Sequence, residues 1–544
     1  MASSPPSSPQ RPIFVNSTNV HRDISLDSPP PENHKPKRRL SSKARSQPPN
    51  KRVKLSLAKD HEEDLLASSS SEEEYSDSDS SFCSAARPKA IFRMLNANAA
   101  SRPGTYSRQF RLPTRPVLET YVSSHKSDMF KCHSAHDGAF LTPPYACAYT
   151  NAAKRGGAPV LAVATEQGSV HVLDTRRRAE WECEPQRTVF QVHNNGVFDV
   201  QWSTTDALFA TASGDKSVRV VDPTARKVLH ILRGHTSTVK SVVWDPTNTN
   251  LLSTGGRDGG ICLWDLRIGE NHTTKQIEDG ISLLDPVMTI KGAHGEDAPA
   301  KGRGRKPKAS ATAARSVTSL LYPENDPYGL VSSGSFDGIL RYWDIRFPTQ
   351  PSKGKARQSK QAQQPLRRSE LDPTVLNGSR PRGITSLVSG SGPTAGLLFA
   401  LGVDSRIHTY DLLSLEPLAN GNTGTFAHPR LQINGFYARL AMSPDGRHLA
   451  SGSAGPRGSA YLFDVSSAGR VASTADTRAV ELRSQIGEVG GLDWAQGMLA
   501  TCADDGTVRV WREDMETMRR CEAKEEGFRD WDFAWRTVED DVDC

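Results

Sequence analysis

The sequence predicts an all-β fold, a seven-bladed β-propeller with a disordered N-terminal tail and two basic loop insertions. Three observations carry this prediction: a strand–turn–strand pattern occurs seven times, its spacing fits one four-stranded blade, and each copy alternates apolar and polar residues. A four-stranded sheet cannot bury both faces alone, whereas radial stacking of such sheets buries both. We therefore expect one large ring over residues 143–512 of the 544-residue chain.

The repeat is marked by an aromatic or aliphatic residue followed by Asp at the end of each copy. Successive ends are separated by 48, 43, 79, 67, 53 and 48 residues, and Arg512 replaces the closing Asp in the seventh copy. One blade of this type takes about 40–45 residues, so the two long intervals predict insertions at about 270–314 and 348–381. The closing acids are Asp174, Asp222, Asp265, Asp344, Asp411 and Asp464.

Each copy reads as strands joined by a tight turn. In the last copy Val508 and Val510 share one face of a strand, while Thr507 and Arg509 share the other. A ring needs one strand of its last blade from the other end of the array, and residues 102–142, within Tyr106 to Phe140, are the expected source. Residues 513–544 remain as a C-terminal extension.

The third copy resembles the WD-repeat family, because Gly234-His235 opens it and Trp264-Asp265 closes it. The resemblance implies that His235, Thr254 and Asp258 form a buried hydrogen-bond relay, which gives them a structural rather than a catalytic role. The equivalent residues expected in the fourth copy are His294, Ser333 and Asp337.

Residues 1–101 are rich in Ser, Pro, Lys and Arg, a composition that predicts a disordered tail. Two basic clusters in this tail predict a nuclear import signal, and therefore a location in the nucleus. The alternatives are a solvated basic run or one that contacts nucleic acid. The clusters contain Lys35, Lys37, Arg38, Arg39, Lys51, Arg52 and Lys54.

Sequence motifs argue for a binding protein rather than an enzyme. The eight cysteines form no Cys-x-x-Cys pair, and no Gly-x-Ser-x-Gly, phosphate-loop or His-Glu-x-x-His motif is present. We therefore expect no catalytic residue, no metal and no cofactor. The sequence also contains no apolar run of about eighteen residues, so no membrane span is expected.

Two consecutive copies end in Trp-Asp-x-Arg. Because Trp and Asp end a strand, Arg267 and Arg346 should emerge on the same side of adjacent blades, where a guanidinium suits a bidentate contact with a partner. Paired copies of this motif resemble those of receptors that bind the cullin-4 ubiquitin ligase adaptor. Asp174-Thr175-Arg176 is a degenerate third copy of little weight. The expected adaptor contacts are Trp264, Asp265, Arg267, Trp343, Asp344 and Arg346.

The order of four segments is similar to that of the denticleless family. These are HNNGVFDVQWSTTDALFATASGDKSVRVVD, GHTSTVKSVVWDP, STGGRDGGICLWDLR and a basic insertion after an Ala-His pair. The resemblance implies a non-catalytic substrate receptor, held to the ligase by a triple-propeller damage-binding adaptor. It implies degron-bearing substrates on the DNA-loaded sliding clamp, including a replication licensing factor and cell-cycle inhibitors, degraded in S phase or after DNA damage.

The family resemblance also implies a degron-reading surface, opposite the adaptor or at the centre of the ring. Asn195, Phe198, Asp199 and Lys240 lie in loops expected to form that surface. Family degrons carry a basic residue, so an acidic patch is expected there, with Asp199 and Glu488 as candidates. Neither tail contains a clamp-binding motif, so direct clamp binding by this chain is not predicted.

Two other functions remain open from the sequence. One is a nuclear WD-repeat scaffold for chromatin or ribosome assembly that never meets a ubiquitin ligase. The other is weak DNA contact through the basic insertions, since GRGRKPK within Lys301 to Lys308 resembles a minor-groove arm. A solvated basic loop or a second import signal is the alternative explanation for that segment.

Overall fold

The computed structural model describes residues 115–522 and 536–537, apart from 136, 180–181, 185–186, 271–275, 278–280, 296–314, 325, 347–363, 376–379, 419–423 and 470–477. The expected disordered tail, its import residues and the segment from Lys301 to Lys308 lie outside the described residues. The described part falls within one compact unit, Ser107–Cys544.

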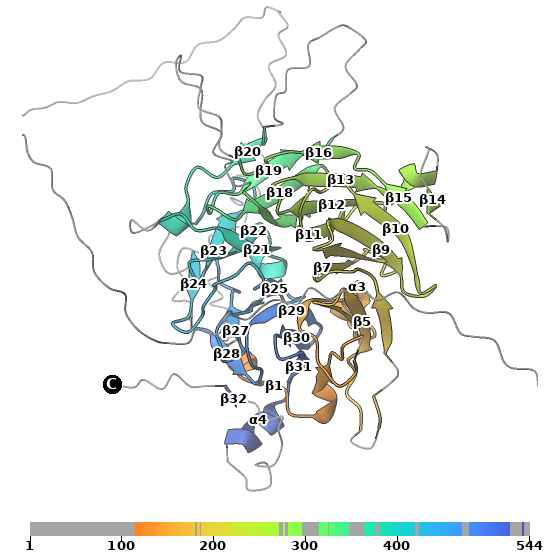
Figure 1. The fold of residues 1–544 in the computed structure, drawn as a ribbon. Coiled ribbons are helices and arrows are strands. Elements are labelled where there is room, and N and C mark those ends of the chain that lie inside the picture. The colour runs from red at the N-terminus through yellow and green to blue at the C-terminus, as the bar shows by residue number, and fades with distance from the viewer. Residues whose placement is uncertain are drawn as a thin grey trace, which may run out of the picture. The chain divides into compact units, whose positions relative to one another are not determined.

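Seven sheets are arranged radially about one axis, which confirms the seven-bladed β-propeller (Figure 1). The first strand of each blade contacts the first strand of the next, all the way round the ring. These first strands therefore lie nearest the axis and the fourth strands lie outermost. Because every blade repeats the same antiparallel order, equivalent positions in different blades lie on the same face of the ring.

The first four blades are built in chain order. Blade 1 contains β3 (Pro144–Tyr149), β4 (Val160–Thr165), β5 (Ser169–Asp174) and β6 (Thr188–Gln191). Blade 2 contains β7 (Val197–Trp202), β8 (Phe209–Ser213), β9 (Ser217–Asp222) and β10 (Lys227–Arg233). Blade 3 contains β11 (Val239–Trp244), β12 (Leu251–Gly256), β13 (Ile261–Asp265) and β16 (Met288–Ile290). Blade 4 contains β17 (Val317–Leu321), β18 (Gly329–Gly334), β19 (Arg341–Asp344) and β20 (Arg367–Arg368).

The last three blades complete the ring. Blade 5 contains β21 (Ile384–Ser389), β22 (Leu397–Gly402), β23 (Arg406–Asp411) and β24 (Thr425–Ala427). Blade 6 contains β25 (Leu440–Met442), β26 (His448–Ser451), β27 (Ser459–Asp464), β28 (Val480–Arg483) and the short β32 (Arg536–Thr537). Blade 7 contains β29 (Val489–Ala495), β30 (Met498–Ala503) and β31 (Thr507–Glu513), joined by β1 (Tyr121–Val122) and β2 (Met129–Lys131).

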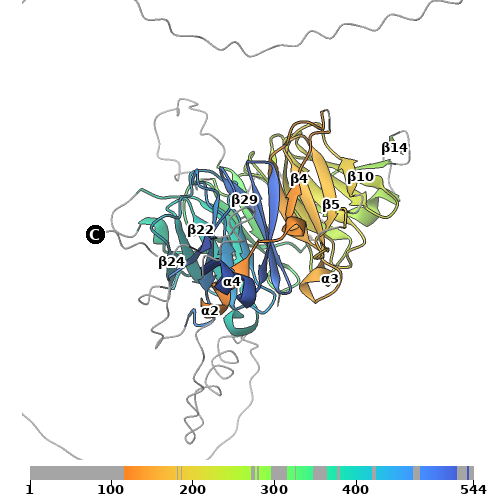
Figure 2. The same cartoon turned by 90° about the horizontal axis from the view of Figure 1, so that it is seen from below.

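The helices are short and lie between or beside the strands. They are α2 (Arg115–Leu118), η1 (Lys126–Asp128), α3 (Asn151–Lys154), η2 (Leu266–Glu270), η3 (Pro373–Val375), η4 (Gly392–Thr394) and α4 (Met515–Glu522). Helices α2 and α4 lie close together at one edge of the ring (Figure 2), where Leu118 and Met518 share a hydrophobic cluster. None of the helices that the structure describes is long and apolar enough to span a bilayer.

Hydrophobic contacts between neighbouring blades form the core. One cluster, for example, combines Val218 and Val220 of blade 2 with Val242 and Trp264 of blade 3. Tryptophans at the ends of three first strands also donate an indole hydrogen bond to the preceding blade. These bonds join Trp202 to the Ala148 carbonyl (3.0 Å), Trp244 to the Gln201 carbonyl (3.1 Å) and Trp494 to the Ala441 carbonyl (3.1 Å).

Chain segments from both ends of the array close the ring. β1 and β2 both pair antiparallel with β31, so residues upstream of blade 1 supply the outer strand of blade 7. Arg512 at the end of β31 donates to the buried Asp128 carboxylate (2.8 Å), and Tyr121 donates to Glu513 (2.8 Å). Arg512 therefore occupies the place of the closing Asp because it pairs with an acid from the closing segment.

The two insertions are narrower than the sequence suggested. Within 270–314, β16 is the outer strand of blade 3, and β15 (Ile281–Leu284) pairs in parallel with β10 and carries β14 (Gln276–Ile277) on its other side. Within 348–381, β20 is the outer strand of blade 4. Such two- to four-residue strands are too short to show alternation, and β20 consists of two arginines, so the insertion boundaries were drawn too wide.

Candidate protein-binding surfaces

The antiparallel order of each blade separates two faces of the ring. Third strands end on one face, which we call the exit face, and it includes the residues that follow Asp174, Asp265 and Asp344. First strands begin on the opposite face, which we call the entry face, and it includes Tyr145 and Phe198. The expected adaptor residues lie on the exit face, and the expected degron-reading residues lie on the entry face.

On the exit face, Arg267 and Arg346 are held in the same way in adjacent blades. Arg267 Nε lies 2.9 Å from Asp265 Oδ1 and its Nη2 lies 2.7 Å from Oδ2, while Arg346 Nε lies 2.9 Å from both oxygens of Asp344. The side chains of Arg267 and Arg346 remain 59% and 65% exposed. The paired carboxylates therefore orient the guanidinium groups without covering them.

Charge interactions and packing inside the blades stabilise these two Asp–Arg pairs. The Arg267 hydrogen bonds lower the pKa of the Asp265 carboxyl, and those of Arg346 lower the pKa of Asp344. Trp264 and Trp343 are buried inside the blades, where they anchor the strand ends that carry the acids. The two tryptophans are therefore structural supports of the exit face and are inaccessible to a partner.

Blade 1 repeats the same arrangement, although its sequence match is degenerate. Arg176 Nε lies 3.1 and 2.9 Å from the two oxygens of Asp174, and its side chain is 70% exposed. Only the spacing Asp-x-Arg signals this site, because Leu173 stands where blades 3 and 4 have Trp. On the exit face, blades 1, 3 and 4 thus each carry an exposed arginine that is oriented by the Asp closing the third strand.

The relay expected in blade 3 is present inside the blade. His235 Nε2 lies 2.8 Å from Thr254 Oγ1, its Nδ1 lies 3.2 Å from both Asp258 oxygens, and Trp264 donates to Thr254 (2.9 Å). Burial lowers the His235 pKa, but hydrogen bonds to Asp258 and Cys262 outweigh burial and raise that pKa to about 9. His235 is therefore a buried, structural cation at neutral pH.

Two further relays were missed by the sequence analysis. In blade 2, His193 bridges Asp215 and Thr211, each at 2.8 Å. In blade 7, Gln485 takes the place of histidine and accepts from Thr501 (2.7 Å), which accepts from Trp511 (3.0 Å). The signal was available in blade 2, since His193 precedes its first strand at the same offset as His235 in blade 3.

In blade 4 the assignment of Ser333 to the relay was wrong. His294 Nε2 and Trp343 Nε1 both bond Ser332 Oγ, at 2.9 and 2.8 Å, whereas Ser333 lies 3.0 Å from Thr318 Oγ1. In blades 3 and 7 the relay threonine lies ten residues before the tryptophan that donates to it, whereas in blade 4 Ser332 lies eleven residues before Trp343. The extra residue in the turn of blade 4 therefore shifts the strand register by one. Because neighbouring strand residues point to opposite faces, Ser332 rather than Ser333 faces the relay.

The assignment of Asp337 to this relay was also wrong. His294 Nδ1 has no hydrogen-bond partner among the described residues, and the Asp337 carboxylate instead lies 3.6 Å from Arg315. Burial, with the nearby charges of Arg341 and Arg315, lowers the His294 pKa to about 3. Blade 4 thus contains a neutral histidine where blade 3 contains a charged one.

On the entry face, the structure brings two of the four expected degron-reading residues together. Lys240 Nζ lies 4.2 Å from the centre of the Phe198 ring. Asn195 is exposed and its Oδ1 accepts from the Gly196 backbone (2.7 Å). The expectation that Asp199 forms part of an acidic patch was wrong, because it is only 6% exposed and accepts from the Val242 backbone (2.9 Å).

Three residues of this region were missed by the sequence analysis. Tyr145 and Tyr437 stack with Phe198 and with each other, at centroid separations of 5.6 to 5.8 Å. Arg439 Nη2 donates to the carbonyls of Phe198 (3.1 Å) and Lys240 (2.9 Å). Tyr437 and Arg439 lie in the segment just before β25 of blade 6, so sequence adjacency gave no sign of their position. We call Tyr145, Phe198, Lys240, Tyr437 and Arg439 the entry-face cluster.

The second acidic candidate, Glu488, is half-buried at the start of blade 7. Its backbone N–H donates to Asp504 (3.2 Å), and burial together with the Asp504 charge raises the Glu488 pKa. In the part of the chain that the structure describes, no group of three or more His, Cys, Asp or Glu could hold a metal ion. The described cysteines are all free thiols.

Comparison with known proteins identifies both the repeat and the family. The family model for the WD domain, G-beta repeat, matches residues 183–222, 226–265, 306–344 and 486–512. Denticleless protein homologs A and B of Xenopus laevis are 32% and 30% identical, over 82% and 80% of this chain and 58% of each relative. The lethal(2)denticleless protein of Drosophila melanogaster is 31% identical over 67% of this chain and 44% of its own length.

This chain spans between 44% and 58% of the length of those relatives. The similarity extends well beyond the matched repeats, because it covers four-fifths of the chain in the Xenopus proteins. Seven blades and the relays of blades 2 and 3 agree with the repeat assignment. The chain is therefore a WD-repeat protein of the denticleless family.

Proposed function

We propose that this chain is a non-catalytic substrate receptor of a cullin-4 ubiquitin ligase. Its exit face binds the triple-propeller damage-binding adaptor of the ligase, and its entry face binds the substrate. The substrates are replication and cell-cycle proteins presented on the sliding clamp, which are ubiquitinated for degradation in S phase or after DNA damage.

The single observation that carries the proposal is the matched pair Arg267 and Arg346. Both follow the third strand of their blades, both are held by the preceding Asp, and both remain exposed on the same face. Each guanidinium has five N–H donors, so an acid-oriented arginine still offers donors to carboxylates or carbonyls of a partner. A flat protein partner contacting adjacent blades would meet both groups at once.

The receptor contributes position rather than chemistry. By holding a substrate lysine near the ubiquitin-charged conjugating enzyme, it raises the effective concentration of the two reacting groups. Separate faces for adaptor and substrate allow both partners to bind simultaneously. This division of labour requires no reactive side chain on the propeller.

The test is capture of the adaptor by the full chain carrying Arg267→Ala and Arg346→Ala together. We expect loss of adaptor recovery from cell extract and from purified components, with an unchanged circular dichroism spectrum and melting temperature. Arg447→Ala is the matched control, since Arg447 is also exposed on the exit face and lies 3.8 Å from Asp445, but follows no third strand. Adding Arg176→Ala measures the contribution of the third site.

Unchanged adaptor recovery by the double variant would refute the receptor proposal and favour the nuclear scaffold.

Location in the nucleus is a further part of the proposal, supported by the basic clusters of the tail. Replacing Lys37, Arg38 and Arg39 with Ala in a fluorescent fusion should shift the protein to the cytoplasm. Weak DNA contact through the insertions predicts chromatin retention that falls steeply with salt, and its loss on deletion of Lys301 to Lys308.

A further inference from the structure

The entry-face cluster joins residues that are distant in sequence. Tyr145 begins blade 1, Phe198 begins blade 2, Lys240 begins blade 3, and Tyr437 precedes blade 6. The three rings are nearly parallel, with interplanar angles of 8°, 28° and 29°. Tyr145, Phe198 and Lys240 are half-buried, and Tyr437 is 40% exposed. The cluster is therefore an aromatic platform that solvent still reaches.

Lys240 occupies the cationic position over this platform. Its Nζ lies 4.2 Å from the Phe198 ring centre and 4.8 Å from that of Tyr437, both distances that give a favourable cation–π contact. A platform already filled by an internal ammonium group does not offer its ring faces to a second cation. The interaction that remains available at this position is an ion pair between the Lys240 ammonium and an incoming anion.

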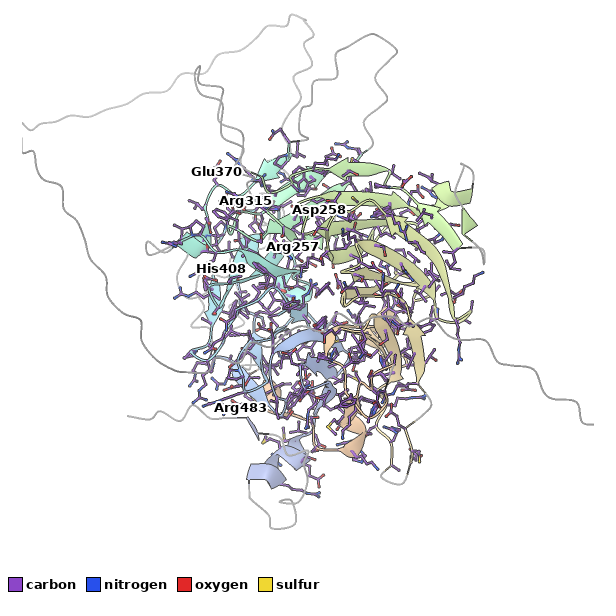
Figure 3. The ribbon with its side chains drawn as sticks, viewed as in Figure 1. Arg257, Asp258, Arg315, Glu370, His408 and Arg483 are labelled. Carbon is purple, nitrogen blue, oxygen red and sulfur yellow. The ribbon has the colours of Figure 1, made fainter. Side chains whose placement is uncertain are left out.

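Nearby charges are predominantly positive around Lys240. Burial, Arg439 and Arg257 together lower the Lys240 pKa to about 8, and no described carboxylate lies within ion-pair distance of its Nζ. The acid nearest to Arg439 is the buried Asp199, at 4.0 Å, which cannot reach solvent. Arg257 lies in the adjoining turn of blade 3, beside Asp258 (Figure 3). A half-buried cation without a counter-ion favours an incoming anion.

The other acids near this part of the entry face have partners other than Lys240, and Asp258 of blade 3 is paired with His235 at 3.2 Å. Glu166 of blade 1 accepts a hydrogen bond from the Tyr145 hydroxyl, and Glu488 of blade 7 lies beside Asp504. The causes that lower the pKa of Lys240 are burial and the charges of Arg439 and Arg257. The region around Lys240 therefore differs in charge from the acidic surface that the sequence suggested.

We infer that the entry-face cluster binds an acidic side chain of a partner peptide, with its carboxylate on Lys240 and a neighbouring apolar side chain on the exposed edge of Tyr437. The inference rests on the proposed receptor function and names the class of peptide that the receptor takes: an Asp or Glu adjacent to an aromatic or aliphatic residue. The carboxylate supplies the missing counter-ion, and the apolar neighbour extends the aromatic platform.

The test is selection of peptides from a random twelve-residue phage-display library on the immobilised full chain. The wild-type chain should enrich peptides with Asp or Glu next to an apolar residue. Lys240→Met keeps the apolar stem over the rings but removes the charge, so the synthesised peptides should bind it roughly tenfold or more weakly. Lys240→Glu reverses the charge and should enrich Lys or Arg in place of the acid.

Lys216→Asn is the matched control. Lys216 is an exposed lysine on the same face, in the turn of blade 2, and its positive φ of 68° is one that Asn tolerates. This variant should select the same peptides as the wild type and bind them equally well. Melting curves of all variants establish that the ring is folded before any comparison.

Three outcomes would overturn the inference: no enrichment of acids by the wild type, selection of the same acidic peptides by Lys240→Glu, or equal loss of binding in Lys216→Asn. The proposed receptor function is tested separately by adaptor capture on the exit face. If adaptor capture requires Arg267 and Arg346 but Lys240 has no effect on peptides, the receptor proposal stands and this inference fails. If instead Lys240 determines peptide binding but Arg267 and Arg346 have no effect on adaptor capture, the peptide site stands and the ligase proposal fails.

Discussion

Arg267 is fixed to Asp265 by three hydrogen bonds: Nε to Oδ1 at 2.9 Å, Nη2 to Oδ2 at 2.7 Å, and the backbone N–H of Arg267 to Oδ1 at 3.0 Å. The aspartate thus determines both the turn after the strand and the direction of the guanidinium. A side chain ordered before binding loses less conformational entropy when a partner arrives. In the Trp-Asp-x-Arg motif the acid therefore orients the arginine, the residue that we propose contacts the adaptor.

Releasing the arginines from their acids should weaken adaptor binding without removing the positive charges. We expect Asp265→Ala with Asp344→Ala to reduce adaptor affinity roughly two- to tenfold for each arginine released, since ordering one side chain costs about 0.5–1.5 kcal/mol. The effect should be smaller than that of removing both arginines. Affinity is measured by biolayer interferometry with purified adaptor, and Asp445→Ala on the same face serves as the control. An unchanged affinity would show that the acids do not orient the arginines for binding.

The charged relay of blade 3 predicts a pH-dependent contribution to stability. In the folded chain the His235 pKa is raised to about 9, above the unfolded value of 6.5. The pair with Asp258 therefore stabilises the fold fully below about pH 6.5 and loses this contribution as pH rises towards 9. At the acid end, the Asp258 pKa of about 2 lies below its unfolded value of 3.8, so stability falls as pH drops through that range.

Asp258→Ala tests this relay. Because it removes a buried hydrogen bond to a charged group, we expect the free energy of unfolding to fall by about 2–3 kcal/mol at pH 6. The difference from wild type should shrink between pH 6.5 and 9, as His235 loses its proton in the wild type. Denaturant unfolding at several pH values measures both quantities. A difference that stays constant across this range would show that His235 is neutral in the folded protein.

Blade 4 offers a direct comparison of two adjacent serines. Ser332→Ala leaves the buried Trp343 N–H and His294 Nε2 without their shared partner, so we expect a loss of about 1–3 kcal/mol in unfolding free energy. Ser333→Ala should cost less, because its partner Thr318 keeps a hydrogen bond to the Ile384 carbonyl. Chemical denaturation ranks the two variants. A larger loss for Ser333→Ala would restore the assignment made from the sequence.

The sequence predicted those parts of the fold that local pattern determines. Alternation and a closing aromatic or aliphatic residue followed by Asp located the third strand of most blades, and the spacing of these ends indicated seven blades. Where the pattern was short it failed: β15 and β20 lie within segments that read as basic loops. The pairing of β15 in parallel with β10 depends on contacts fifty residues apart, which no local pattern encodes.

The exit face and the entry face were predictable from the sequence to different degrees, again because only positions that a local pattern determines can be predicted. Arg267 and Arg346 could be placed because the strand end before them fixes where they emerge. The entry-face cluster could not, because Arg439 reaches the carbonyls of Phe198 and Lys240 across about two hundred residues of sequence. Asp199 was misassigned because its neighbour Phe198 faces the cluster, and adjacent strand residues point to opposite sides.

Ring closure depends on the ion pair between Arg512 and Asp128, which the sequence repeat indicated only by an Arg in place of the closing Asp. Arg512 stands where six other copies have Asp, and its Nε lies 2.8 Å from Asp128, whose side chain is 1% exposed. Removing one partner of a buried pair leaves the other charge without compensation, at a cost of about 3–5 kcal/mol. Arg512→Met keeps the bulk of the side chain and isolates the loss of charge.

We therefore expect Arg512→Met to reduce the unfolding free energy by about 3–5 kcal/mol and to increase proteolysis near β1 and β2, which pair with β31. Arg520→Ala, which removes an exposed pair with Glu516 in α4, should change stability by less than about 1 kcal/mol. Asp128→Asn with Arg512→Met should recover part of the loss, because the unpaired buried charge is then gone. If both arginine variants had equally small effects, closure would depend on the strand pairing alone.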